Sequence, residues 1–165
     1  MSKAAPSSVW RLGDEIDTDV LAPGAYMQHG IEIIAQHCLE SVRPEFAANV
    51  QRGDVIVAGK NFGIGSSREQ AAGVLVHFGI RAVIAPSYSG LYFRNAFNLG
   101  LLLITCKAAG QLTDDAPITI EWQGDQPTLL QGKLRLACEP IPHFLREMVA
   151  AGGLLNQLKL KFQKS

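Results

Sequence analysis

Three short apolar runs that contain no charged residue constrain this chain more than any other feature. They span residues 55–58, 82–85 and 101–105, and each borders a glycine or a proline. Runs of this length and composition are typical of buried strands. The stretch between the first two runs has apolar residues at helical spacings of three and four, namely Ala71, Val74, Leu75 and Phe78. A second helix is expected from Pro86-Ser87 through Asn98, so the alternation of strand and helix predicts a parallel α/β core.

Shorter elements are expected on either side of this core. Val9 to Leu12 is predicted as a short strand, and the polar segment Gly13 to Asp19 as an ordered loop. The remaining expected elements are helices over 31–38 and from Pro44, strands over 118–122, 128–130 and 133–137, and a helical region from Pro142 that breaks at Gly152-Gly153. We expect a single domain over residues 1–165, in which residues 1–8 form a loose terminus.

The charge balance excludes two classes of partner. Fifteen basic residues face fifteen acidic ones, which gives no electrostatic reason to expect a nucleic acid or an anionic membrane. The apolar stretches are shorter than the roughly 18 residues of a membrane span, and the first ten residues lack the apolar run of a signal peptide. We therefore expect a cytoplasmic protein.

The three cysteines are expected to be reduced, structural thiols. Cys38, Cys106 and Cys138 are odd in number and widely spaced, with no C-x-x-C pair. His37, His77 and His143 do not fall at metal-ligand spacing with a cysteine or a carboxylate. We therefore expect no metal site and no cofactor on this chain. The aromatic residues at 88, 92, 93 and 97 are expected to serve the core or a subunit interface.

A loop rich in glycine and serine, residues 59–70, is the best candidate for chemistry. It lies between a predicted strand and a predicted helix, where backbone N–H groups and the helix dipole favour an anion. Gly63 and Gly65 let the backbone approach a ligand closely, and Arg68 offers a planar fork suited to a carboxylate. Both the dinucleotide and the phosphate-loop patterns fail in this segment. A small carboxylic acid is therefore a better expected ligand than a nucleotide.

An alternative for the same segment is purely structural. Ser66 and Glu69 have the spacing of a capping box, in which Ser66 would cap the helix and Glu69 would stand three residues inside it. The two interpretations conflict for Ser66, because a hydroxyl bound to its own helix is a poorer base. A serine acts as a base only where N–H donors and a nearby cation stabilise its ionised form.

At this point the chain resembles the small subunits of 3-isopropylmalate dehydratase, in the aconitase family. The resemblance extends over roughly residues 9–160 and is carried by Asp17-Thr18-Asp19, the 59–70 segment, 81–85, Phe93-Arg94-Asn95, 98–101 and 151–155. It implies the swivelling β/β/α domain that forms the fourth domain of aconitase. It also implies a hydro-lyase that interconverts 2-isopropylmalate and 3-isopropylmalate in leucine biosynthesis.

The resemblance assigns roles to residues and to a partner. Ser66 matches the base that removes a proton from carbon, and Asp19 matches an acidic residue near it. Ser67 and Arg68, with Gly65 beside them, match the groups that bind the substrate carboxylate. A separate large subunit is expected to carry a [4Fe–4S] cluster, so the chain is expected to act only in a heteromer on a small hydroxy diacid.

The loop after Pro23-Gly24 tunes substrate choice in this family. Its residues here are Tyr26, Met27, Gln28 and His29, whereas typical family members have an arginine after the aromatic residue. Gln28 cannot replace that charge, so 2-methylmalate, 2,3-dimethylmalate and, less favourably, homoaconitate stand as alternative substrates. A rival of another class is a non-catalytic module that binds an anion or a nucleotide with the same loop.

Overall fold

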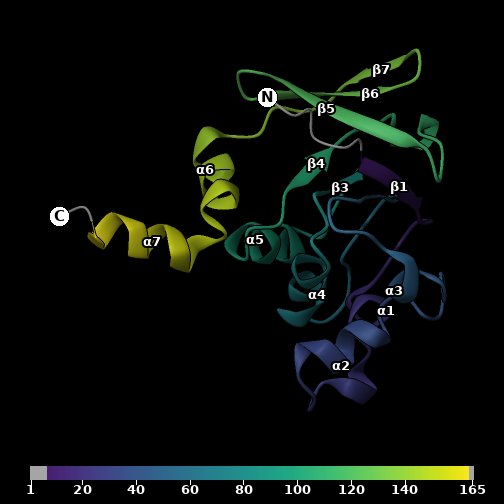
Figure 1. Ribbon diagram of the computed structural model, residues 1–165, viewed down its shortest axis with the longest axis vertical. Helices are drawn as coiled ribbons and strands as arrows, with labels where there is room; N and C mark the ends of the chain where they lie inside the picture. Colours follow the sequence, from purple (N-terminus) through teal and green to yellow (C-terminus); the bar gives the residue numbers. More distant parts are fainter. Residues whose placement is uncertain (1–6, 164–165) are drawn as a thin grey trace.

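A computed structural model describes residues 7–163, which form one mixed seven-stranded sheet flanked by helices (Figure 1). The strand order is β4-β3-β2-β1-β5-β6-β7. The strands are β1 (Ser7–Arg11), β2 (Val55–Val57), β3 (Ala82–Ala85), β4 (Leu103–Thr105), β5 (Pro117–Gln123), β6 (Gln126–Gln131) and β7 (Leu134–Ala137). The fold is therefore mixed α/β, as predicted.

The first half of the sheet is parallel. β1 pairs with β2, β2 with β3 and β3 with β4, in a register that places Ile56 opposite Val83. Every residue of β2 and β3 is buried. Complete burial explains why these runs are uniformly apolar, because a parallel sheet is covered on both faces. The predicted parallel core is confirmed, with β1 added to it.

The second half of the sheet is an antiparallel meander. β5, β6 and β7 pair in sequence, and β5 joins the parallel half through Ser7 opposite Ile118 and Ser8 opposite Pro117. These two serines were expected in a loose terminus, but pairing with β5 extends β1 over them. The other residues of that expected terminus, 1–6, lie outside the described residues. The three predicted strands of the meander are confirmed.

Helices cover the parallel strands and continue into the C-terminal part of the chain. They are α1 (Thr18–Leu21), α2 (Ile31–Gln36), α3 (Phe46–Asn49), α4 (Gln70–Phe78), α5 (Gly90–Asn98), α6 (His143–Ala151) and α7 (Leu154–Gln163), with single 3₁₀ turns η1 (Gly24–Tyr26) and η2 (Ala109–Gln111). In Figure 1, α1–α5 gather below the sheet, β5–β7 lie at the top, and α7 projects to one side.

Two predicted boundaries were wrong. α1 begins at Thr18, inside the expected loop over residues 13–19, because the Asp17 carboxylate caps this short helix by accepting a hydrogen bond from Val20 N–H at 2.8 Å. α5 begins at Gly90 rather than at Pro86-Ser87, because Tyr88 forms a β-bridge with Phe62. Both differences bring extra segments against the 59–70 loop.

A single hydrophobic core lies between the sheet and the helices. Its largest fully buried side chains include Phe46, Phe62 and Phe97. The three cysteines are free and buried within it, as the structural interpretation predicted. Burial raises the pKa of Cys38. A hydrogen bond between the other two thiols lowers the pKa of Cys106 to about 7 and raises that of Cys138.

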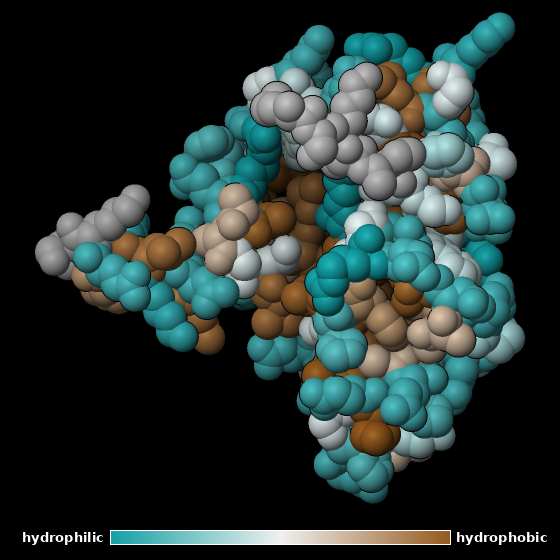
Figure 2. Space-filling model, in the orientation of Figure 1, coloured by the Kyte–Doolittle hydropathy of each residue, from teal (hydrophilic) through white to brown (hydrophobic). Residues whose placement is uncertain are grey.

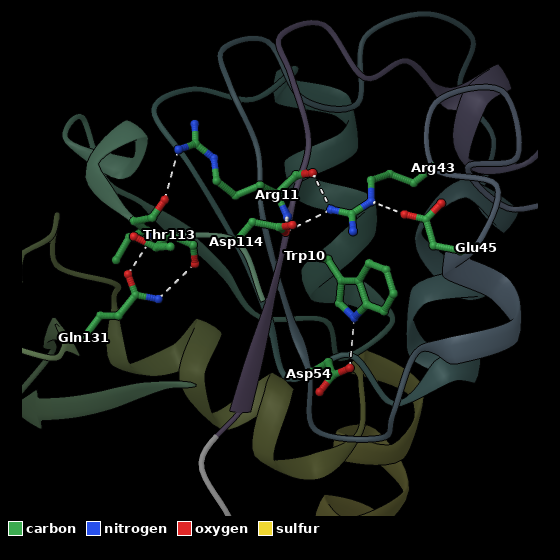
Figure 3. A network of polar contacts seen from close by, with 9 residues as sticks. Trp10, Arg11, Arg43, Glu45, Asp54, Thr113, Asp114 and Gln131 are labelled. Carbon is green, nitrogen blue, oxygen red and sulfur yellow. Dashed lines mark hydrogen bonds and ion pairs between the residues drawn. The ribbon is translucent and has the colours of Figure 1, made fainter. Parts of the chain in front are cut away.

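A polar network holds β1 in place through Trp10 and Arg11 (Figure 3). Arg43 Nη1 donates to the Asp114 carboxylate at 2.9 Å and to the Arg11 carbonyl at 3.1 Å, while its guanidinium lies 4.7 Å from the Trp10 ring centre. Asp114 also accepts the Arg11 N–H at 2.7 Å, and Trp10 Nε1 donates to Asp54 at 2.9 Å. The network joins segments that are far apart in sequence. It holds β1 in position, where the parallel half of the sheet meets β5.

Candidate functional site

Main-chain hydrogen bonds tie residues 13–18 to the glycine–serine loop. Beyond the ends of β1 and β2 the two segments remain side by side, with Glu15 N–H donating to the Lys60 carbonyl at 2.8 Å. Gly63 N–H donates to the Ile16 carbonyl at 2.7 Å, and Thr18 N–H to the Ile64 carbonyl at 2.9 Å. This pairing brings the Asp17-Thr18-Asp19 motif against residues 63–65, although the two lie far apart in sequence.

The segment before α5 holds the other side of the loop. Ser87 accepts hydrogen bonds from Asn61 N–H through its hydroxyl at 2.9 Å and from Phe62 N–H through its carbonyl at 3.1 Å, and Ser89 N–H donates to the Phe62 carbonyl at 2.9 Å. Gly63 has a φ of 84°, and a Cβ at this position would lie 2.2 Å from the Tyr92 ring. Only glycine fits there.

Four predicted site residues, Gly65 to Arg68, line one shallow pocket. The remaining lining residues are Thr18, Gly63, Ser89, Leu91, Tyr92 and Asn95. The pocket encloses about 10 Å³, space for roughly one water molecule, whereas small-molecule sites usually measure about 300–1,000 Å³. These residues therefore form one wall of a site rather than a complete cavity.

Unused backbone donors surround this pocket. Within residues 7–163, the N–H groups of residues 64 to 69 donate no hydrogen bond to another protein group. The loop leads into the N-terminus of α4, where the helix dipole adds partial positive charge. A run of free N–H groups next to a helix start is suited to an anion.

Arg68 is held from one side and open on the other. Its Nη1 donates to Asp19 Oδ1 at 2.8 Å and to the Ala22 carbonyl at 3.0 Å. Nε and Nη2 have no hydrogen-bond partner among the described residues, so they remain available to a carboxylate. The Arg68 hydrogen bond, followed by that from Gly24 N–H, lowers the pKa of Asp19 below 3.8. Asp19 thus contacts Arg68 and lies outside the pocket lining.

The hydroxyls of Ser66 and Ser67 are exposed and have no hydrogen-bond partner in the described part of the chain. α4 begins at Gln70, four residues after Ser66, and no side chain caps it. The capping-box alternative is therefore wrong, because Glu69 rather than Ser66 is the N-cap residue of α4. Ser66 keeps its hydroxyl free for chemistry.

The predicted substrate-selecting loop lies beside the pocket but does not line it. Tyr26 stacks on His37 with ring centres 3.6 Å apart, and Met27 packs against the core. Gln28 and His29 are exposed. The start of the loop is connected to the site, because Gly24 N–H donates at 2.8 Å to the same Asp19 carboxylate that contacts Arg68.

The sequence interpretation missed five residues that line the pocket. Thr18 is buried, and its hydroxyl would lie 3.1 Å from a Cβ on Gly65. Leu91, Tyr92 and Asn95 come from α5, and Ser89 is its N-cap residue. Thr18 and Asn95 belong to motifs that carried the family resemblance, but no role in the site was predicted for either of them; nothing in the sequence placed the other three there.

The donor set of the described residues does not fit a metal cluster. No group of three or more His, Cys, Asp or Glu side chains within residues 7–163 is arranged to hold a metal ion. The three thiols are buried in the core, two of them hydrogen-bonded to each other. Among the described helices, none has the length and apolar character to cross a membrane.

Comparison with known proteins agrees with this geometry. The family model described as Aconitase C-terminal domain matches residues 22–109. A 3-isopropylmalate dehydratase small subunit 1 of Archaeoglobus fulgidus is 42% identical over 91% of this chain and 94% of its own length. A methanogen homoaconitase small subunit of Methanothermobacter thermautotrophicus is 40% identical over 90% of this chain and 86% of its own. The crystal structure of a 3-isopropylmalate dehydratase from Methanocaldococcus jannaschii superposes with a TM-score of 0.85 at 36% identity, covering 96% of this chain and 98% of that one.

Proposed function

Because this chain belongs to the aconitase family, with relatives that are 3-isopropylmalate dehydratase small subunits, we propose that it is the small subunit of a hydro-lyase. The reaction interconverts 2-isopropylmalate and 3-isopropylmalate by dehydration and rehydration. Its setting is leucine biosynthesis in the cytoplasm.

The observation that carries this proposal is the set of free donors around one pocket. The N–H groups of residues 64 to 69 and two nitrogens of Arg68 have no protein acceptor among the described residues. A substrate carboxylate supplies the missing acceptors. Arg68 and Ser67 bind that carboxylate, and the fixed geometry of Arg68 orients it, because Asp19 and the Ala22 carbonyl hold Nη1.

Ser66 is the proposed base that removes the proton from the carbon next to this carboxylate. Its hydroxyl is not used to cap α4, and it stands among N–H donors and beside a guanidinium. These groups stabilise an ionised oxygen in the low-dielectric site that a closed complex provides. The same positive surroundings stabilise the negative charge that develops on the carboxylate as the proton leaves.

The shallow pocket supports a partner that completes the site. The small-subunit names of the relatives imply a large subunit, which we propose covers this wall and carries the [4Fe–4S] cluster. Such a cluster would supply Lewis-acid chemistry at the substrate hydroxyl. This chain's residues bind the opposite end of the substrate and take up the proton.

The charge of the pocket favours a diacid over a triacid. Among the described residues that line it, Arg68 is the only one with a positive charge, and loop residues 25–30 contain no lysine or arginine. The third carboxylate of homoaconitate would have no cation from this chain. Isopropylmalate is therefore the first candidate, with 2-methylmalate and 2,3-dimethylmalate as further possibilities that the same charge pattern accepts.

A second candidate is a homoaconitase small subunit. The 40% identity to the Methanothermobacter protein favours it, since that value nearly equals the 42% to the Archaeoglobus dehydratase subunit. An activity screen of the reconstituted complex against isopropylmalates, substituted malates and homoaconitate separates the two candidates. Turnover of homoaconitate alone would overturn the isopropylmalate assignment.

The test of the site uses three serine variants of the complex with its large subunit. Ser66→Ala should lower kcat about a hundredfold to ten-thousandfold, the usual contribution of a general base. Ser67→Ala should mainly raise KM, because it removes a carboxylate contact. Ser41→Ala, at an exposed serine outside the pocket, should behave as wild type. Normal turnover by Ser66→Ala would show that Ser66 is not the base.

Binding of nucleotides by the isolated chain, measured by calorimetry, would instead favour the non-catalytic module.

A further inference from the structure

The C-terminal part of the chain exposes hydrophobic side chains that the proposed reaction does not explain. α6 and α7, residues 143–163, are called here the α6–α7 arm. No residue of α7 is buried, and Leu155 and Phe144 are 73% and 62% exposed. Leu154 and Leu158 lie one turn apart on the same face of α7, beside Leu155. Contiguous apolar surface of this kind marks an interaction site.

A groove continues this apolar surface toward the body of the molecule. It has a volume of about 390 Å³ and lies between α5 and α6. Its apolar walls include Phe93, Phe97, Phe144, Leu145 and Met148. Figure 2 shows hydrophobic side chains gathered in the hollow where the arm meets the body.

The arm is held firmly in its projecting position. Gly152 and Gly153, with φ of 83° and 112°, form the bend between the two helices. This bend packs on the α5–β4 turn so closely that a Cβ on Gly153 would lie 2.6 Å from the Asn98 carbonyl oxygen. Arg146 of α6 donates to the Gly124 carbonyl at 2.6 Å and lies 3.9 Å from the Trp122 ring centre. These contacts therefore fix the bend from which α7 and its exposed leucines project.

The charges on α7 and in the groove are positive, whereas Glu147 of α6 pairs with His143 at 3.0 Å. Lys159 and Lys161 flank the leucines of α7, and Arg94 lines the groove. No acidic residue occurs between Met148 and Gln163. A second copy of the arm would bring lysines against lysines, whereas a partner with acidic side chains around an apolar contact would match.

The groove and the proposed catalytic wall lie on the same helix. Leu91 and Asn95 of α5 line the serine pocket, while Gly90 and Arg94, each directly before one of them in sequence, line the groove. A partner that covers the serine pocket therefore reaches the groove by extending across α5.

We propose that the α6–α7 arm and the α5–α6 groove form a docking surface for the large subunit, which places an apolar segment bordered by acidic side chains against them. This inference rests on the proposed function, since it names the partner that the function requires. The arm acts in assembly and touches no reacting atom.

The test compares arm variants in binding to the large subunit. Leu155→Glu/Leu158→Glu should raise the dissociation constant about tenfold or more, the effect typical of central interface residues, measured by calorimetry. Lys159→Glu/Lys161→Glu should slow association and reduce its dependence on salt. Val42→Glu, at a 46% exposed apolar residue outside the arm, and Lys133→Glu, at an exposed lysine in the β6–β7 turn, are the matched controls and should bind as wild type. At saturating large subunit, the leucine variant should recover the wild-type kcat.

Three outcomes would overturn the proposal and are distinguishable. Wild-type affinity of the leucine variant, with an unchanged circular dichroism spectrum, would show that the arm is not the docking surface while leaving the proposed function intact. Failure of the wild-type chain itself to bind the large subunit would overturn both. A dimer of the isolated chain in sedimentation experiments that Leu155→Glu/Leu158→Glu dissociates would assign the arm to a second copy.

Discussion

At the scale of single residues, the pairing of Asp19 with Arg68 explains how a partly buried guanidinium can be held in one orientation. The acid uses one oxygen to accept hydrogen bonds from both Arg68 and Gly24 N–H. The resemblance to the family gave Asp19 a place near the serine base, whereas the structure gives it a contact with the neighbouring arginine. We infer that Asp19 is a positioning residue that acts through Arg68.

Replacement of Asp19 tests this inference. Asp19→Ala should raise KM several-fold, because the freed guanidinium loses its orientation, while Asp19→Asn keeps an acceptor oxygen and should restore most of the affinity. Since Arg68 holds the pKa of Asp19 below 3.8, the carboxylate is ionised above that pH and the ion pair is lost only as pH falls through the lowered pKa. The ratio of kcat/KM between wild type and Asp19→Asn should therefore be constant above about pH 5. A step in that ratio between pH 5 and 8 would contradict the assignment.

At the scale of elements, the order of strands and helices was predictable, but several boundaries were not. Uniformly apolar runs located β2, β3 and β4, because strands that are buried on both faces are apolar throughout. Helical spacing of apolar residues located α4. The structure starts α4 at Gln70 and, because of the Tyr88–Phe62 bridge, α5 at Gly90, and neither start is visible in local sequence. For the same reason the sequence located the loop of the site but missed most of the side chains that α5 adds to it.

The close contact of the loop with α5 gives a prediction for Gly63. Gly63→Ala places a Cβ against the buried Tyr92 ring at a position with positive φ. We expect a loss of about 2–4 kcal/mol in the free energy of unfolding, from overpacking and backbone strain together. Gly73→Ala, inside α4, is the matched control, because the atom nearest to the added Cβ would be 3.9 Å away. It should raise stability by about 0.5–1 kcal/mol. Urea unfolding measures both, and a neutral Gly63→Ala would contradict the packing.

At the scale of the whole molecule, the network around Arg43 connects the two halves of the sheet. Arg43 precedes α3, Arg11 ends β1, and Asp114 precedes β5. Partial burial acts to raise the pKa of Asp114, but the hydrogen bonds from Arg11 N–H and the Arg43 side chain outweigh it and lower that pKa. The carboxylate therefore stabilises the fold above its ordinary pKa, and this contribution is lost as pH falls through the lowered value.

Asp114→Asn should lower the free energy of unfolding at pH 7 by about 1 kcal/mol. The estimate is modest because the Asp114 side chain is 41% exposed and solvent screens the ion pair. The difference from wild type should shrink as pH falls below about 4. Urea unfolding, followed by tryptophan fluorescence, measures the effect, and the neighbouring Asp115→Asn is the control that should change stability by less than about 0.5 kcal/mol. Equal losses in both variants would show that Asp114 has no special role.

The main-chain hydrogen bonds between residues 13–18 and 59–65 have a consequence for how such a protein can evolve. Most of the hydrogen bonds between these segments join peptide groups, with the Asp14 carboxylate accepting one more from Lys60 N–H. The distance between the serines and the start of the 25–30 loop therefore does not depend on which side chains that loop carries. Mutations in the loop can therefore alter which acid is accepted without disturbing the apparatus that removes the proton. New specificities can arise by few substitutions, and an engineer who exchanges this loop between relatives should obtain active hybrids.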